Sequence, residues 1–158
     1  VIATPGCESN VKEIFDKTWE LRNTREDVVI FNQFEEMGNC VWHYHVTGNA
    51  IAEVYESIKT ENSRFAGACF TSGSAGTMSA GDLLKEKYPN SKLAVGEALQ
   101  CPTLLNNGFG GHRIEGIGDK HVPWIHNVKN TDMVIAIDDD DSPSWRRSTD
   151  GNTRCCSR

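Results

Sequence analysis

The chain has 158 residues, which suits one domain with its own hydrophobic core. A formal net charge of −6, with lysines and arginines scattered along the sequence, argues against a nucleic-acid partner. No apolar run approaches the length of a membrane span, and the start at Val1 has no signal-peptide pattern. We therefore expect a cytoplasmic protein with no membrane partner.

The cysteine and histidine spacings indicate neither a disulfide framework nor a metal centre. Most of the six cysteines are far apart, and the adjacent Cys155 and Cys156 have no partner pair at a ligand spacing. His43 and His45 are two residues apart, and no third ligand stands at a familiar interval. We expect reduced cysteines and no bound metal.

The first part of the sequence predicts a strand, a helix and a second strand. Residues 1–4 have the apolar character of the end of a buried strand. Apolar side chains at helical spacing predict an amphipathic helix over about residues 9–22. The β-branched run 28–31 predicts a strand buried on both faces, which would complete a βαβ unit.

The rest of the sequence continues this alternation and predicts an α/β domain with a mainly parallel sheet over residues 1–137. After an irregular stretch over 35–46, Thr47 is placed to cap a helix from Ile51 to Ile58. The elements expected next are a strand over 65–70, a helix over 78–88, a strand over 93–96, a long turn over 106–111 and a buried strand over 133–137.

The composition changes abruptly at Asp138. Four aspartates are followed by a polar sequence without periodicity up to Arg158. An aspartate run can hold a divalent cation, but a run of like charges is more often a solvated segment. We expect residues 138–158 to form a polar, poorly ordered tail that contributes little to the core.

The most informative stretch is 71–81, with the sequence Thr-Ser-Gly-Ser-Ala-Gly-Thr-Met-Ser-Ala-Gly. It lies between a predicted strand and a predicted helix, so small and hydroxyl residues form a turn at the helix start. Such a turn points free backbone N–H groups and the positive end of the helix dipole at one place. It predicts a phosphate site, although a plain connection can have the same pattern. It is neither a Walker loop nor a dinucleotide fingerprint, because both glycine motifs are absent.

Four sequence blocks carry a family resemblance. They are Asn32-Gln33-Phe34 with Asn39, His43 and Thr47-Gly48; Gly73-Ser74-Ala75-Gly76-Thr77; His112 to Gly118 with Val122-Pro123; and Met133 to Asp138. In this order the blocks resemble segments of the fold-type II pyridoxal-phosphate enzymes, most closely the cysteine synthase and cystathionine β-synthase group. The resemblance implies part of the three-layer, tryptophan synthase β-like fold, a mainly parallel sheet with helices on both faces.

The resemblance also implies site residues for pyridoxal 5'-phosphate and for a substrate. The cofactor phosphate would be bound by backbone N–H groups, and by the Ser74 and Thr77 hydroxyls, of Gly73, Ser74, Ala75, Gly76 and Thr77. A flexible backbone wall beside the cofactor ring would be formed by Gly116, Ile117 and Gly118.

Gln33 would donate a hydrogen bond to the α-carboxylate of the substrate. Strand ends are where α/β sheets bind ligands, but an ordinary polar residue can also end a strand. Gly116 to Gly118 can equally form a plain turn. We interpret His43 as an orienting or surface histidine and not as a base.

The sequence also departs from the family pattern. Ala75 replaces a glycine and restricts φ in the loop. The family's Schiff-base lysine lies in an N-terminal Ser-x-Lys context, and neither Lys12 nor Lys17, the two lysines before the first block, has it, so the catalytic residues stay unknown. Ser57-Ile58-Lys59 has the spacing but follows the first block. The Ser-Gly-Asn-Thr substrate loop and the late Ser-Ser-Gly segment are also missing. We expect the middle part of such an enzyme, inactive on its own.

Two functions remain open at this level. The first is a portion of a pyridoxal-phosphate-dependent lyase or transferase of cysteine biosynthesis, which eliminates or replaces the β-substituent of serine, O-acetylserine or cysteine. Because the family is usually dimeric, a homodimer would fit this function. The second is a non-catalytic domain that binds an anion or acts as a scaffold.

Overall fold

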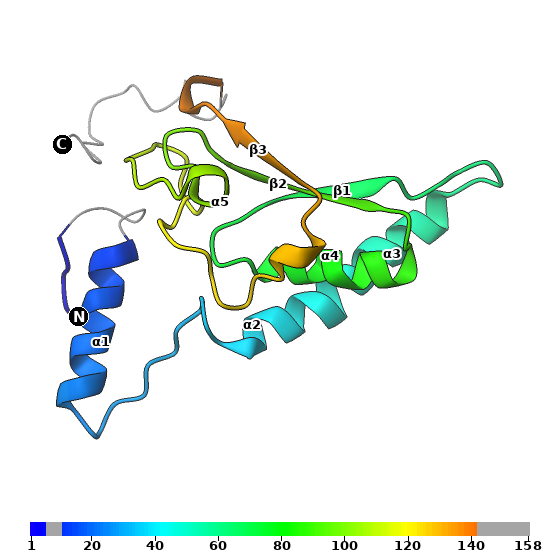
Figure 1. Ribbon diagram of the computed structural model, residues 1–158. Helices are drawn as coiled ribbons and strands as arrows, with labels where there is room; N and C mark the ends of the chain where they lie inside the picture. The colour runs from blue at the N-terminus through cyan, green and yellow to red at the C-terminus, as the bar shows by residue number, and fades with distance from the viewer. Residues whose placement is uncertain (6–10, 142–158) are drawn as a thin grey trace. The chain divides into compact units, whose positions relative to one another are not determined.

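The computed structural model describes residues 1–5 and 11–141 (Figure 1). Helices and strands alternate through the middle of this part of the chain. The elements are α1 (Val11–Thr24), α2 (Met37–Trp42), the π-helical turn η1 (His43–Thr47), α3 (Gly48–Ile58), β1 (Gly67–Thr71), α4 (Gly76–Lys87), β2 (Lys92–Ala98), α5 (Thr103–Asn106), the 3-10 turn η2 (Val128–Asn130), β3 (Met133–Ile137) and the 3-10 turn η3 (Asp139–Asp141).

The three strands form one sheet in the order β1-β2-β3. β1 and β2 are parallel, and Phe70 is paired with Val95 in their register. β3 runs in the same direction as β2, because Asp132 N donates to Leu93 O at 2.9 Å and, farther along both strands, Leu99 N donates to Ile137 O at 2.8 Å. The expected α/β fold with a parallel sheet is confirmed.

The chain divides into two compact units, and the boundary between them falls within β2 and within β3. The first unit contains residues 1–32, 97–122 and the chain from 136 onward, and the second contains 33–96 and 123–135. The expectation of a single domain over 1–137 stays a prediction.

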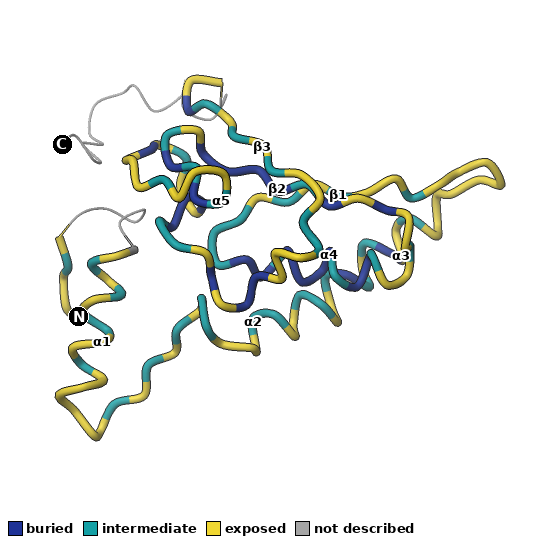
Figure 2. The backbone as a smooth tube through the Cα atoms, viewed as in Figure 1, coloured by how far each residue is buried: buried dark blue, intermediate teal, exposed yellow. Residues whose placement is uncertain are grey.

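Helix α4 is the centre of the second unit. Ala80 and Leu84 of this helix are fully buried, as is Val95 of β2. Most of the α4 trace is coloured as buried in Figure 2. α4 comes so close to β2 that a Cβ on Gly81 would lie 2.6 Å from Leu93 Cδ1, so a larger residue here would have to displace the buried Leu93 side chain. α4 also contacts α2, η1 and α3, and these helices lie on the same side of the sheet in Figure 1.

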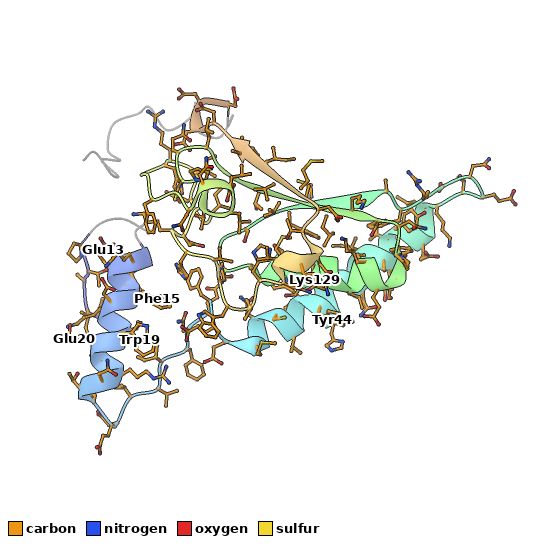
Figure 3. The ribbon with its side chains drawn as sticks, in the orientation of Figure 1. Glu13, Phe15, Trp19, Glu20, Tyr44 and Lys129 are labelled. Atoms are coloured by element: carbon orange, nitrogen blue, oxygen red, sulfur yellow. The ribbon has the colours of Figure 1, made fainter. Side chains whose placement is uncertain are left out.

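The first unit has a smaller apolar cluster that begins at the last residue of β2 and is formed by Ala98, Cys101 and Ile117. Next to this cluster, the buried carboxylate of Glu97 accepts hydrogen bonds from backbone N–H groups of α5. In α1, Phe15 and Trp19 project from one side of the helix and Glu20 from the other (Figure 3). The Phe15 ring meets the ring of His121 edge-on, with centroids 5.1 Å apart.

The strands expected over 1–4 and 28–31 are wrong, and with them the first βαβ unit. Neither segment has regular secondary structure or a strand partner within the described residues. Val29 and Phe31 are 78% and 86% exposed. A β-branched run forms a stable strand only where neighbouring chain pairs with it and covers its side chains. The helix expected over 9–22 is confirmed as α1, from residue 11 onward.

The irregular stretch expected over 35–46 is also wrong, because the chain is helical from Met37 to Ile58. Thr47 has helical dihedral angles, φ −65° and ψ −44°, and its side chain caps nothing. The cause of the error is the π-helical turn η1. It inserts an extra residue into the helix, so the 3.6-residue period that sequence analysis looks for is interrupted at this point.

The last predicted strand is correct in position and wrong in burial. β3 alternates between exposed and half-buried residues, and Met133 is 57% exposed. The cause is its place at the edge of the sheet, with one face left uncovered by the described residues.

The start of the expected tail packs within the first unit. Asp139 is 4% exposed and accepts a hydrogen bond from Arg113 N at 2.7 Å. Gln100 Nε2 donates to Asp138 Oδ1 at 2.9 Å. Residues 142–158, including Cys155 and Cys156, lie outside the described residues. Of the cysteines that the structure describes, Cys40, Cys69 and Cys101 are free thiols.

The carboxylate of Asp132 ties β2 to α4. It accepts from Leu93 N at 2.8 Å and pairs with Lys85 at 2.6 Å and Lys92 at 3.1 Å. The Lys85 ammonium, followed by the Leu93 N–H, holds the pKa of Asp132 well below its usual range. Asp132→Asn should therefore lower the melting temperature by several degrees at pH 7.

The wild type should lose this advantage as the pH falls below about 4 toward the lowered pKa, because its own carboxylate then takes up a proton. The melting temperatures of the two proteins should converge in acid. The control is Asp27→Asn, because the Asp27 side chain pairs with Arg25 but is 69% exposed. An equal loss in both variants would contradict the prediction.

A second test of the fold concerns Glu97, which is 3% exposed. Its carboxylate accepts from Leu104 N at 2.8 Å and Leu105 N at 3.0 Å. Glu97→Ala should cost about 2 kcal/mol in urea unfolding, because both N–H groups lose their acceptor. Glu115→Ala, at an exposed position in the same unit, should change stability little.

Candidate functional site

The loop between β1 and α4 lies at the carboxyl end of the parallel sheet, where α/β folds bind ligands. Ser72 N donates to Gly96 O of β2 at 3.4 Å, which holds the start of the loop to the neighbouring strand. Helix α4 begins at Gly76, so the predicted phosphate loop is the N-terminus of a helix, as expected from the sequence.

Ala75 makes the turn that starts the helix. It adopts the left-handed conformation, φ 66° and ψ 8°, and Met78 N donates to its carbonyl oxygen at 3.1 Å. For a residue with a Cβ, this conformation costs about 1 kcal/mol or more. The substitution of the family glycine by Ala75 therefore keeps the turn but strains it.

The loop presents an array of unused donors. In the part of the chain that the structure describes, no protein acceptor receives the backbone N–H groups of Gly73, Ser74 and Ala75. The N–H groups of Gly76 and Thr77 belong to the first helical turn, which has no acceptor one turn earlier. No charged side chain of the described residues hydrogen-bonds to this loop. Neutral donors at a helix N-terminus fit a phosphate group.

Two amides from the segment before α4 meet at the Ser74 hydroxyl. Gln33 Nε2 donates to Ser74 Oγ at 2.9 Å, and Asn39 Nδ2 donates to the same oxygen at 3.1 Å. Asn39 Nδ2 also donates to Gln33 O at 3.0 Å. The structure thus brings the predicted substrate residue Gln33 to the predicted phosphate loop.

The π-helical turn η1 brings His43 against the start of α4. A Cβ on Gly76 would lie 2.6 Å from His43 Cδ2 and would also meet the Asn39 amide, so glycine is required here. His43 Nδ1 lies 2.9 Å from Thr47 Oγ1, which fixes the orientation of the ring. The interpretation of His43 as an orienting or surface histidine stays a prediction. π-helical turns are frequent at functional sites.

Thr77 Oγ1 donates to Thr71 O at 3.3 Å, so in this structure its hydroxyl proton is used in a hydrogen bond within the loop. This contact leaves the expected bond from the Thr77 hydroxyl to a phosphate as a prediction.

Gly116, Ile117 and Gly118 belong to the first unit, whereas the phosphate loop belongs to the second. Gly116 and Gly118 have positive φ angles of 78° and 73°. The Gly118 carbonyl accepts from Cys101 Sγ at 3.4 Å and lies 3.2 Å from His112 Nε2. Their role beside a cofactor ring stays a prediction.

Sequence analysis gave no role to Asn39 or to Asp119. Asn39 is six residues after Gln33 and lies in the first turn of α2. Its contacts are with Gln33 and Ser74, and no regular spacing along the sequence indicates them. Asp119 follows the Gly-Ile-Gly segment directly and is 7% exposed. Burial raises the pKa of this carboxyl, against a smaller opposite effect of His121 and His112.

The described residues contain no helix both long and apolar enough to cross a bilayer. They also contain no group of three or more His, Cys, Asp or Glu side chains arranged to hold a metal ion.

Comparison with known proteins gives clear relatives. No family model matches the chain. A cysteine synthase from Staphylococcus aureus is 30% identical in an alignment of length 150 that covers 93% of this chain. A probable cysteine synthase from Bacillus subtilis is 30% identical over 148 residues.

This chain is a relative of the cysteine synthases. It spans 46% of the length of both relatives. The resemblance to the fold-type II pyridoxal-phosphate enzymes, on the four sequence blocks, is confirmed.

Solved structures of related enzymes have the same fold as this cysteine synthase relative. A hydrogen sulfide-producing enzyme from Fusobacterium nucleatum superposes with a TM-score of 0.71 at 27% identity, over 84% of this chain and 44% of that one. An O-acetylserine-dependent cystathionine β-synthase from Helicobacter pylori superposes with a TM-score of 0.68 at 25% identity, over 82% and 40% of the two chains.

The strain at Ala75 can be tested by two alanine-to-glycine changes. Ala75→Gly should leave the melting temperature unchanged or raise it, because relief of the left-handed strain offsets the extra freedom of glycine in the unfolded chain. Ala50→Gly, at an exposed position in α3, should cost about 1 kcal/mol. Thermal unfolding measures both, and a larger loss at Ala75 than at Ala50 would disprove the strain.

Proposed function

We propose that this chain is the phosphate-binding portion of a pyridoxal-phosphate-dependent lyase or transferase of the cysteine synthase type. The observation that carries the proposal is the array of free N–H groups from Gly73 to Thr77 at the start of α4. The proposal is also supported by the similarity to a cysteine synthase and a probable cysteine synthase, each aligned with 93% of this chain. The donors follow one another along the loop into the first turn of α4, and such an array at a helix N-terminus suits a phosphate.

The remaining roles follow from this assignment. Gln33 uses one N–H of its amide for Ser74 and keeps a second, which we assign to the α-carboxylate of an amino-acid substrate. The backbone at Gly116 to Gly118 is assigned to the side of the cofactor ring. Serine, O-acetylserine or cysteine is the proposed class of substrate, in cytoplasmic cysteine biosynthesis, and a homodimer is the proposed assembly.

When bound, pyridoxal phosphate supplies an electron sink for loss of the α-proton and of a β-substituent. The part of this chemistry that the second unit can supply is binding and orientation. Three of its lysines are engaged elsewhere, since Lys85 and Lys92 pair with Asp132 and Lys87 donates to Asn49 at 2.7 Å. Together with the missing N-terminal Ser-x-Lys context, this leads us to expect that the chain does not turn over O-acetylserine or cysteine by itself.

The proposal is tested by a visible absorption spectrum of the purified protein with pyridoxal 5'-phosphate, followed by borohydride reduction and peptide mapping. We expect phosphate-dependent retention of the cofactor, with pyridoxal as the control that lacks the phosphate. Ser74→Ala should weaken retention about 10-fold, because a hydrogen bond to a charged group is lost. Failure to retain pyridoxal phosphate better than pyridoxal would reject the phosphate site.

The peptide mapping also shows whether the chain has its own lysine that binds the cofactor covalently. Unspecific labelling of several lysines agrees with a binding portion that lacks its own covalent lysine. One specifically modified lysine, or measurable turnover of O-acetylserine or cysteine, would contradict the expected inactivity.

A further inference from the structure

We propose that Asn39 is a positioning residue that fixes the Ser74 hydroxyl as a hydrogen-bond donor to the phosphate of the bound ligand. The inference rests on the phosphate site proposed above and adds to it the residue that sets the direction of one of its donors. Asn39 does not touch the ligand in this proposal but acts through Ser74.

The orientation of the Asn39 amide is settled by its partners. A backbone carbonyl can only accept a hydrogen bond, so the Asn39 atom that lies 3.0 Å from Gln33 O must be the nitrogen Nδ2. The second proton on the same nitrogen then serves Ser74 Oγ at 3.1 Å. The opposite amide orientation would place an oxygen against the Gln33 carbonyl.

The Ser74 hydroxyl therefore has its acceptor capacity filled. A hydroxyl has two lone pairs and one proton. The lone pairs receive Asn39 Nδ2 and Gln33 Nε2, the latter at 2.9 Å. Within the described part of the chain, no protein atom accepts the remaining proton of Ser74. This proton is left for a ligand atom that accepts and does not donate, such as an ionised phosphate oxygen.

The position of Asn39 is well supported by its neighbours. Ser79 of α4 donates to the Cys40 thiol at 3.0 Å, which fastens the start of α2 to α4 one residue after Asn39. Gly76 leaves room for the Asn39 amide beside the first turn of α4. The arrangement predicts a preference for a ligand that carries a phosphate over the same ligand with a hydroxyl group in its place.

The test is a double-mutant cycle on Asn39 and Ser74. Binding of pyridoxine 5'-phosphate is followed by its fluorescence, because this ligand has no aldehyde and cannot react with lysines. Asn39→Ala should weaken binding about 3- to 10-fold when Ser74 is present, as expected for loss of one neutral hydrogen bond. In the Ser74→Ala background the same substitution should have no further effect.

Two further variants separate positioning from a structural role. Asn39→Asp keeps the size of the side chain but offers only acceptors, so it should take the Ser74 proton and weaken binding more than Asn39→Ala. Asn49→Ala removes another amide of the same helical segment, which donates to His45 O at 2.6 Å away from the loop, and should leave binding unchanged. Circular dichroism and melting temperatures verify that each variant is folded.

The outcomes distinguish this inference from the proposed function. If the wild type binds pyridoxine 5'-phosphate no better than pyridoxine, both fall. If the wild type prefers the phosphate but Asn39→Ala has no effect, or the same effect with and without Ser74, the phosphate site stands and the role of Asn39 is overturned. Coupling between Asn39 and Ser74, together with the stronger effect of Asn39→Asp, supports the role.

Discussion

The close approach of α4 to β2 is the contact on which the rest of the second unit depends. Gly81 allows the helix to lie directly on Leu93. Because α4 begins at Gly76, next to the ends of the strands, its free N–H groups are presented at the edge where α/β sheets bind ligands. The packing of α4 on the sheet and the position of the phosphate loop are thus linked.

The helical segment from Met37 to Ile58 supplies the other half of the site. It delivers Asn39 and His43 to the first turn of α4, and the π-helical turn η1 widens the helix at that point. Gln33 reaches the loop from the chain before this segment. The site is therefore assembled from two successive parts of the sequence around a single hydroxyl, that of Ser74, whose hydrogen bonds join Gln33 and Asn39 to the loop.

Sequence analysis succeeded where a residue pattern and its packing agree. The run 65–70 and the loop 71–81 were interpretable because small residues and hydroxyls between a strand and a helix favour a tight turn with free N–H groups. It failed at Val28 to Phe31, where composition favours a strand but no described part of the chain covers the side chains. It also failed at His43 to Thr47, because an inserted residue breaks the helical period. The role of Asn39 depends on distances between segments, which no spacing along the chain contains.

The helical segment and α4 run in the same direction and are fastened at both ends. Near the start, Asn39 meets Ser74 and Cys40 meets Ser79. Near the other end, Asn49 accepts from Lys87, and Tyr88 donates to Glu56 just after α4 ends. Contacts at both ends oppose sliding of the two helices along each other. An axial shift of α4 would therefore stretch hydrogen bonds to its neighbour as well as those of its own loop.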